Sequence, residues 1–276
     1  MYTLHVRRRL AATTGALLLA TGAVLTGASP VAAAGPAPRV EARNGPVLEV
    51  VSTETSLTAP ATARPGPVTF RSSTTHEGSG WVGLARAHED GTTSFLGGVV
   101  NHPGRPGLFT TTLTPGEYVL FDYLYTQGGA EPRERRLTVS GPVSGTTPKP
   151  TATIVSREVP GKGPRFTVTG KLRAGAPIRF TNELPGQYNE AVLFPLPANV
   201  TRAELQAFFD AADEGEPVEA PFDTSLGLGS LPLSTDRSQV FQVPLERGRH
   251  VLVTWVRDSS GHLLAKQGQF EIVDVC

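Results

Sequence analysis

The chain has 276 residues and is electrically balanced, with 25 basic and 25 acidic residues. If the three arginines at positions 7–9 are removed with a leader, 22 basic residues face 25 acidic ones, a net charge near −3. A nucleic-acid-binding protein needs a basic face, so this balance argues against a nucleic-acid partner. The 30 glycines and 24 prolines, with recurring Thr and Val, are typical of many short strands joined by turns.

The N-terminus has the layout of a secretory signal. Three arginines at 7–9 precede an apolar or small-residue stretch from Leu10 to Val24, and small residues lead to the Ala32-Ala33-Ala34 run. The apolar stretch is too short to span a membrane, which takes about 20 apolar residues. We therefore expect cleavage after Ala34 and a secreted, extracytoplasmic protein with no membrane span. The Arg7-Arg8 pair leaves open whether export follows the general or the twin-arginine route.

The rest of the chain divides into two β-rich segments. Residues 35–46 form a flexible lead, and the Pro-, Gly- and Thr-rich residues 141–152 predict an extended linker. A first β-sandwich is expected over 47–140 and a second over 153–275. One cysteine, Cys276, cannot form an intrachain disulfide. It leaves open a free thiol or a disulfide-linked dimer, and an end residue without a role is the favoured interpretation.

The two segments resemble each other. Ala63–Phe70 parallels Arg173–Phe180, and Leu113–Leu120 parallels Leu245–Leu252. The second segment has about 22 extra residues between these blocks. They contain a capping box, Thr201-Arg202-Ala203-Glu204, followed by apolar residues at helical spacing. We predict one inserted helix over 202–213, with its apolar stripe packed on a sheet.

Aromatic residues gather on the strand that starts at Tyr118. Phe121, Tyr123 and Tyr125 share one face, and the first segment has no helix to cover them, so we expect them to be more exposed. With Trp81, the two tyrosines form a candidate recognition surface, because exposed aromatics stack on sugars or anchor protein partners. The alternative is that they fill the core.

The pattern Leu-x-Pro-Gly-x-Tyr-Val-Leu of residues 113–120 resembles the penultimate strand of cupredoxin-like domains. The second segment is more similar, with its strand from Pro177 to Asn182, its helix, the stretch Leu226–Gly229 and the block at 245–256, in that order. The resemblance implies an all-β fold of two tandem Greek-key cupredoxin-like β-sandwiches, the second with one inserted α-helix. Copper members of the family bind the metal through two His, one Cys and a weak axial Met.

The positions that correspond to copper ligands hold other residues. The first His position is Asn189, the Cys position is Thr254 (Asp122 in the first segment), and the last-loop positions are near Leu264 and Gln269. His262 falls two residues early. The resemblance therefore implies the scaffold without a blue-copper site and without a cofactor.

Other groups of residues give weaker evidence for a metal site or an active site. His76, His88 and His102 have no metal-site spacing and are expected as exposed loop residues. The sequence contains neither G-x-S-x-G nor H-E-x-x-H, and the acidic pair Asp213-Glu214 at the helix end is expected in solvent. Asp122 faces a predicted core, where a carboxylate needs a partner. The arginines at 133, 135 and 136 are candidates for that partner.

These observations favour a non-catalytic interaction or structural protein of the cell envelope or exterior, whose partner is an unidentified protein or envelope glycan. Two alternatives stay open. One is an extracytoplasmic metal-binding protein that uses the first-segment histidines. The other is an enzyme with an unrecognised site near Asp122.

Overall fold

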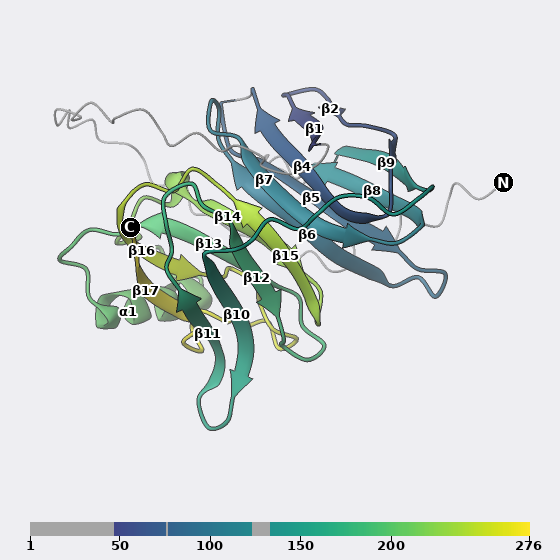
Figure 1. Cartoon of the computed structure of the whole chain (residues 1–276). Coiled ribbons are helices and arrows are strands. Elements are labelled where there is room, and N and C mark those ends of the chain that lie inside the picture. The colour runs from purple at the N-terminus through teal and green to yellow at the C-terminus, as the bar shows by residue number, and fades with distance from the viewer. Residues whose placement is uncertain (1–46, 76, 123–132) are drawn as a thin grey trace.

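The computed structural model describes residues 47–75, 77–122 and 133–276. These residues form a mostly-β protein with two mixed sheets packed around a hydrophobic core, and one α-helix (Figure 1). The predicted signal and lead, residues 1–46, lie outside the described residues. Within those that are described, no helix has the length and apolar character needed to cross a membrane.

The two sheets have eight and nine strands. In spatial order, the first sheet contains β11 (Gly163–Gly170), β10 (Ala152–Val159), β12 (Ile178–Asn182), β15 (Arg237–Gln242), β7 (Gly107–Leu113), β4 (Gly66–Thr74), β1 (Val47–Ser52) and β2 (Leu57–Thr58). The second contains β17 (Phe270–Val275), β16 (Gly248–Val253), β13 (Asn189–Pro195), β14 (Leu228–Leu233), β6 (Thr93–Asn101), β5 (Gly80–Ala87), β8 (Gly116–Asp122), β9 (Arg133–Val139) and β3 (Thr62–Ala63).

Both sheets run without interruption from one half of the chain into the other. β7 pairs with β15 in the first sheet and β6 pairs with β14 in the second, both antiparallel. We call these two pairings the seam. Strand order on one side of the seam mirrors that on the other, so that β4 and β12 occupy matching places and each pairs in parallel with the first long strand of its half. One core cluster contains residues of both halves, among them Phe70, Phe109, Phe180 and Phe241.

A buried glutamine completes the hydrogen bonding at the seam. β6 and β14 pair at Val99 with Ser230 and again at Leu96 with Leu233, and two glycines of β6 lie between these points. Gln239, in the opposite sheet, accepts from the Gly98 N–H at 2.9 Å and donates to the Gly98 carbonyl at 2.9 Å. A Cβ at Gly97 would lie 2.5 Å from Gln239 Oε1, so only glycine allows this approach.

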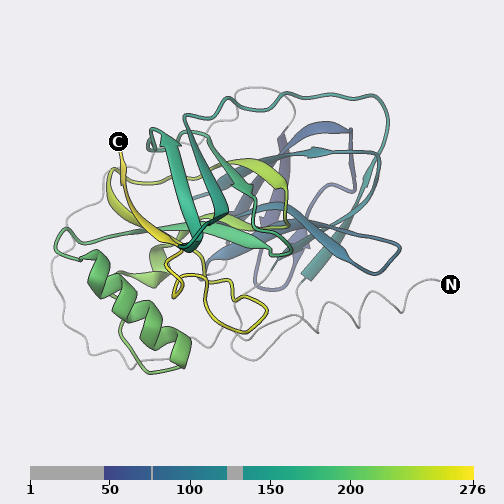
Figure 2. The same ribbon diagram turned by 90° about the horizontal axis from the view of Figure 1, so that it is seen from below.

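The predicted helix forms as α1 (Arg202–Glu214), and its capping box is present, with Thr201 and Glu204 each accepting from the other's backbone N–H. Its buried stripe of Leu205, Phe208 and Phe209 packs against β13, β16 and β17, so the expected packing on a sheet is confirmed. In Figure 2 the helix lies beside the C-terminal strands and loops, drawn in yellow.

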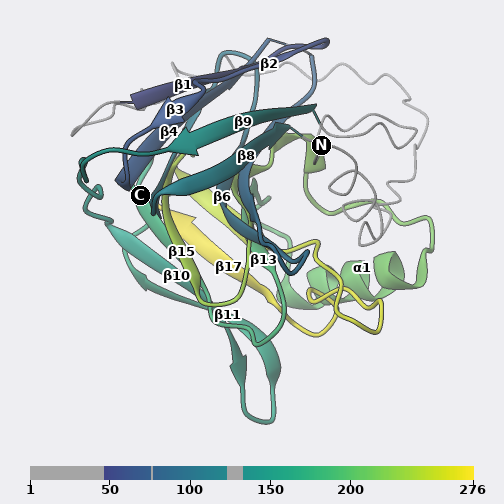
Figure 3. The same ribbon diagram turned by 90° about the vertical axis from the view of Figure 1, so that its right-hand side faces the viewer.

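Residues 141–151 of the predicted linker have no helix or strand, whereas Ala152 already begins β10, and two backbone bonds fix the segment. Ser144 N–H donates to the Pro65 carbonyl at 2.8 Å, and Thr151 N–H donates to the Pro177 carbonyl at 2.9 Å. These carbonyls precede the matching strands β4 and β12. Beyond the linker, the β10–β11 hairpin projects from the sandwich at the edge of the first sheet (Figures 1 and 3).

Replacement of Gln239 by Leu should destabilise the protein by about 2–4 kcal/mol, because it leaves the buried N–H and carbonyl of Gly98 without these partners. Urea unfolding followed by tryptophan fluorescence measures the loss. The matched control is Gln242→Leu, which removes one half-buried bond to the Gly175 carbonyl and should cost about 1 kcal/mol. Equal losses in the two variants would contradict the importance of the seam glutamine.

Candidate functional site

Asp122 is fully buried at the end of β8 and is partnered on both oxygens. Arg133 Nη2 donates to Oδ2 at 2.7 Å, Ser52 Oγ donates to the same oxygen, and the Trp81 N–H donates to Oδ1 at 3.3 Å. Arg133 also donates to the Thr53 carbonyl. Of the three arginines named as candidates, Arg133 is the partner, and Arg135 and Arg136 are exposed. The carboxylate ties β1, β5, β8 and β9 together at one end of the sandwich.

The candidate recognition surface is only partly described. Trp81, in β5, is half-buried, and its indole N–H donates to Ser79 Oγ at 2.7 Å. Tyr123 and Tyr125 lie outside the described residues. The surface therefore stays a prediction.

The expectation that Phe121 is exposed is wrong, since only 7% of this residue is accessible. Its ring lies on Gly83, where a Cβ would come within 2.3 Å of it, and it packs edge-on against Phe95 with the ring centroids 6.0 Å apart. Tyr188, from the other half of the chain, packs against Phe95 at 5.9 Å. A glycine in the neighbouring strand gives the ring a place to lie flat, and this cannot be inferred from alternation along β8 alone.

The histidines of the first half have separate local partners. His88 Nε2 lies 2.8 Å from Ser94 Oγ, and His102 Nε2 lies 2.8 Å from the Gly227 carbonyl oxygen. Burial lowers the pKa of His102, which is half-buried rather than fully exposed as expected. His76 lies outside the described residues. Among residues 47–75, 77–122 and 133–276, no three His, Cys, Asp or Glu side chains are grouped as a metal would require.

In the second half, the positions that the resemblance assigns to copper ligands are joined by hydrogen bonds. Asn189 Nδ2 and Gln269 Nε2 each donate to Ser156 Oγ at 2.5 Å, and all three residues are fully buried. Thr254 is also fully buried, and its hydroxyl accepts from the Val256 N–H at 3.1 Å. We call Ser156, Asn189 and Gln269 the amide cluster; it joins β10, β13 and the loop before β17.

These residues do not fit copper. A blue-copper site uses imidazole and thiolate ligands, whereas this position offers carboxamides and hydroxyls. The amide nitrogens carry hydrogens and point at Ser156, so they cannot bind a cation. Leu264 lies in an apolar cluster with Leu184 and Val256. We therefore derive no metal chemistry at this end of the sandwich.

Glu190, next to the amide cluster, is a buried acid with few donors. Its Oε1 accepts from the Trp255 N–H at 2.8 Å, which fixes the start of the loop after β16. Burial raises the pKa of Glu190 to about 7, and the bond from Trp255 only partly opposes this. As the pH rises from about 4.5 to about 7, Glu190 loses its proton in the unfolded chain but keeps it in the folded protein. The folded protein therefore loses stability over this pH range.

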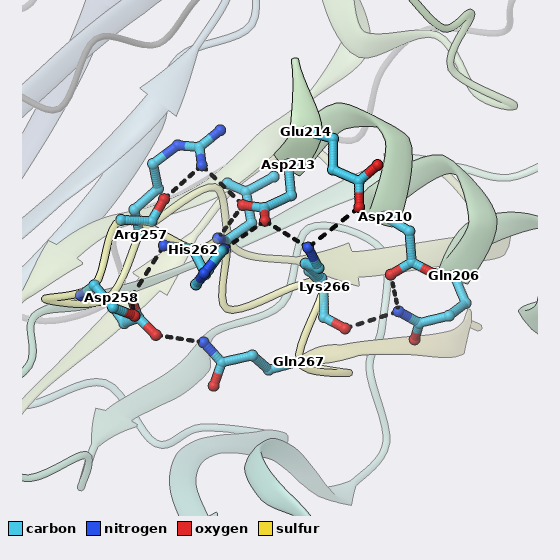
Figure 4. A network of polar contacts seen from close by, with 12 residues as sticks. Gln206, Asp210, Asp213, Glu214, Arg257, Asp258, His262, Lys266 and Gln267 are labelled. Atoms are coloured by element: carbon cyan, nitrogen blue, oxygen red, sulfur yellow. Dashed lines mark hydrogen bonds and ion pairs between the residues drawn. The ribbon is translucent and has the colours of Figure 1, made fainter. Parts of the chain in front are cut away.

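Asp213 fastens the same loop to α1 (Figure 4). Its side chain is 2% exposed and accepts from Arg257 Nη1 at 2.8 Å, His262 Nδ1 at 2.7 Å, the Leu263 N–H at 2.7 Å and Lys266 Nζ at 2.9 Å. Burial alone would raise the pKa of Asp213, but the Leu263 N–H, Lys266 and His262 outweigh it and hold the pKa well below its ordinary value. The expectation that this residue lies in solvent is wrong, because the loop folds over the helix end.

Asp258 organises the loop from within. It accepts from the Ser260 N–H and hydroxyl, from the His262 N–H and from Gln267 Nε2, at 2.6–3.0 Å. These bonds lower its pKa against the effect of burial. The carboxylates of Asp213 and Asp258 therefore stabilise the fold above the pKa of an unfolded Asp, and this contribution is lost as the pH falls through their lowered pKa values.

Sequence reasoning missed Glu190 and Asp213. Glu190 follows a position that was compared with a copper ligand, and a carboxylate at the start of an apolar strand was the available signal. Asp213 sits at i+4 from Phe209, adjacent to the helix's apolar stripe. That placement suggested a carboxylate at the border of the packed face, but its partners are 44 to 53 residues further along the chain.

No protein-family model and no curated protein matches this sequence. The chain is similar in structure to a multicopper oxidase, with 10% identity over 83% of this chain and 88% of the other and a TM-score of 0.25. It is also similar to auracyanin from Roseiflexus castenholzii (16% identity, 45% of this chain, 94% of the other, TM-score 0.29). A third similar structure is the copper-containing nitrite reductase of Thermus scotoductus (14% identity, 83% and 61%, TM-score 0.26). Scores this low establish neither fold nor activity for this chain.

Replacement of Glu190 by Gln should stabilise the protein at pH 8 by about 3 kcal/mol, because Gln keeps the acceptor for Trp255 and removes a buried charge. At pH 4, where the acid is protonated in both states, the variant and the parent should differ by less than about 1 kcal/mol. Urea unfolding at the two pH values measures this. The control Glu183→Gln alters an exposed acid and should change neither value. A pH-independent effect of Glu190→Gln would contradict the raised pKa.

Proposed function

We propose that this protein is an exported, non-catalytic interaction or structural protein of the cell envelope or exterior, built on a cupredoxin-like scaffold without a blue-copper site. The observation that supports this most is the amide cluster. Asn189 and Gln269 occupy positions where the resemblance implies ligands, and they bond to Ser156 instead. At this end of the sandwich, side chains serve to hold strands together.

The matching end of the first half supports the same interpretation. Asp122 occupies the place that corresponds to Thr254, and it is used in an ion pair with Arg133 at 2.7 Å. A buried carboxylate with both oxygens partnered is suited to fixing strands, and it is a poor acid or base until those partners move. This weighs against an enzyme with its site at Asp122.

The recurrence of strand pairings supports the proposal of two cupredoxin-like repeats. The pairings β1–β4, β4–β7, β5–β6, β5–β8 and β8–β9 of the first half have counterparts in β10–β12, β12–β15, β13–β14, β13–β16 and β16–β17. The metal-binding alternative has less support, because His88 and His102 bond to different local groups.

Co-sedimentation of the purified protein with washed cell-envelope material tests the proposal. We expect saturable binding. At the concentration that half-saturates the parent protein, the Trp81→Ala variant should show a bound fraction at least about 5-fold lower, because a half-buried indole is a strong anchor when a partner covers it. The control Leu226→Ala removes an exposed apolar side chain elsewhere and should leave binding unchanged. Failure to bind at any salt concentration would overturn the envelope function. Circular dichroism of each variant separates lost binding from lost folding.

A further inference from the structure

Positive charge is concentrated in one short part of a chain that is otherwise acidic. Residues 149–179 contain seven of the 25 basic residues and one of the 25 acidic residues, Glu158. Acidic residues instead collect on and after α1, from Glu204 to Asp223. A segregation of this kind produces a local positive potential on a molecule whose net charge is near zero.

The fold places this segment on one edge of the first sheet. Arg157 and Arg165 are directly opposite each other in the β10–β11 hairpin, and Lys162 is exposed at its turn. Arg179 in β12 is opposite Thr153 of β10, which in turn is opposite Thr169 of β11. Because side chains alternate along a strand, these residues face away from the buried Ala152 and Ile154. The result is a face of threonine hydroxyls with the guanidinium groups of Arg157 and Arg179, which we call the basic face. The Arg165 guanidinium instead donates to the Gln267 carbonyl at 2.6 Å, in the loop before β17.

The basic face continues into a shallow depression at the base of the hairpin. Lys149, Lys171 and Arg173 line a hollow of about 440 Å³, with Thr151 and Gly170 in its wall. None of the three cations forms an ion pair with an acidic residue of the described chain.

The wall of the depression is held by backbone bonds. Lys171 N–H donates to the Thr151 carbonyl at 3.1 Å, and Thr151 N–H donates to the Pro177 carbonyl. The backbone of Cys276 bonds to Leu172 and Ala174 on either side of Arg173. The backbone around Lys171 and Arg173 is therefore fixed, and a bound anion would lower the repulsion among the three exposed cations.

We infer that the basic face binds an acidic glycan, with one carboxylate, sulfate or phosphate group of the polymer seated in the depression beside Lys149, Lys171 and Arg173. The inference rests on the proposed function and names the partner class. Threonine hydroxyls next to cations suit a polymer that carries both sugar hydroxyls and charges. Single-stranded nucleic acid fits less well, because it needs exposed aromatic platforms, and the one aromatic residue of 149–179, Phe166, is buried.

Binding of the full-length protein to immobilised heparin, polygalacturonate and neutral dextran tests this inference. We expect saturable binding to at least one acidic polymer that weakens as salt rises, and no binding to dextran. The variant Lys149→Gln/Lys171→Gln/Arg173→Gln should lose at least about 10-fold in affinity, the cost of removing three charges from one site. The control Arg136→Gln/Arg237→Gln/Arg247→Gln removes three exposed cations elsewhere and should change affinity by less than about 2-fold.

The outcomes separate this inference from the function on which it rests. Equal affinity of the two triple variants, or equal binding to dextran, overturns the inference even if the protein still co-sediments with envelope material. Tighter binding to single-stranded DNA than to any glycan at the same salt overturns the glycan assignment. If the parent protein binds no acidic polymer and does not co-sediment with envelope material, the inference and the proposed function are both overturned.

Discussion

Two strand pairs, β6 with β14 and β7 with β15, make one sandwich out of two similar halves. Each half alone would expose these strands as sheet edges, which are unpaired and prone to association. Pairing them with each other removes four edges and merges the interiors into one core cluster. The pairing of the two halves leaves backbone groups of β6 without a strand partner, and Gln239 supplies that partner. It satisfies the backbone of Gly98, where the ladder between β6 and β14 is interrupted.

Once the halves are joined, the ends of the sandwich are closed by polar side chains. The amide cluster closes the second half, and the Asp122–Arg133 pair closes the first. Three carboxylates fix the loop between β16 and β17. Glu190 bonds to its first residues, Asp213 bonds to it from α1, and Asp258 bonds to other residues of the loop itself. Buried polar groups need partners, and most of these atoms obtain them from one another; Gln269 Oε1 and Arg133 Nε are buried without a hydrogen-bond partner among the described residues. The unevenly charged outer surface is therefore the part of the molecule that we expect to bind a partner.

Much of the architecture is predictable from sequence. Strand periodicity and the capping box at Thr201 predict a mostly-β protein with one helix, because these signals are local. The parallel between the segments ending at Phe70 and Phe180 predicts two similar halves. The seam, the burial of Phe121 and the partners of Asp213 are not predictable in this way. Each depends on residues far apart in the chain, such as Gly83 for Phe121 and Lys266 for Asp213. Alternation shows which side chains share a face, but it does not show what covers that face.

Differential scanning calorimetry of the whole protein tests whether the seam joins the two halves into one unit that unfolds as a whole. If the shared core makes the two halves one cooperative unit, the calorimetric and van't Hoff enthalpies of unfolding should agree within error. A calorimetric enthalpy about twice the van't Hoff value, or two resolved transitions, would show that the halves unfold independently. That result would contradict the central role given to the pairings β6–β14 and β7–β15.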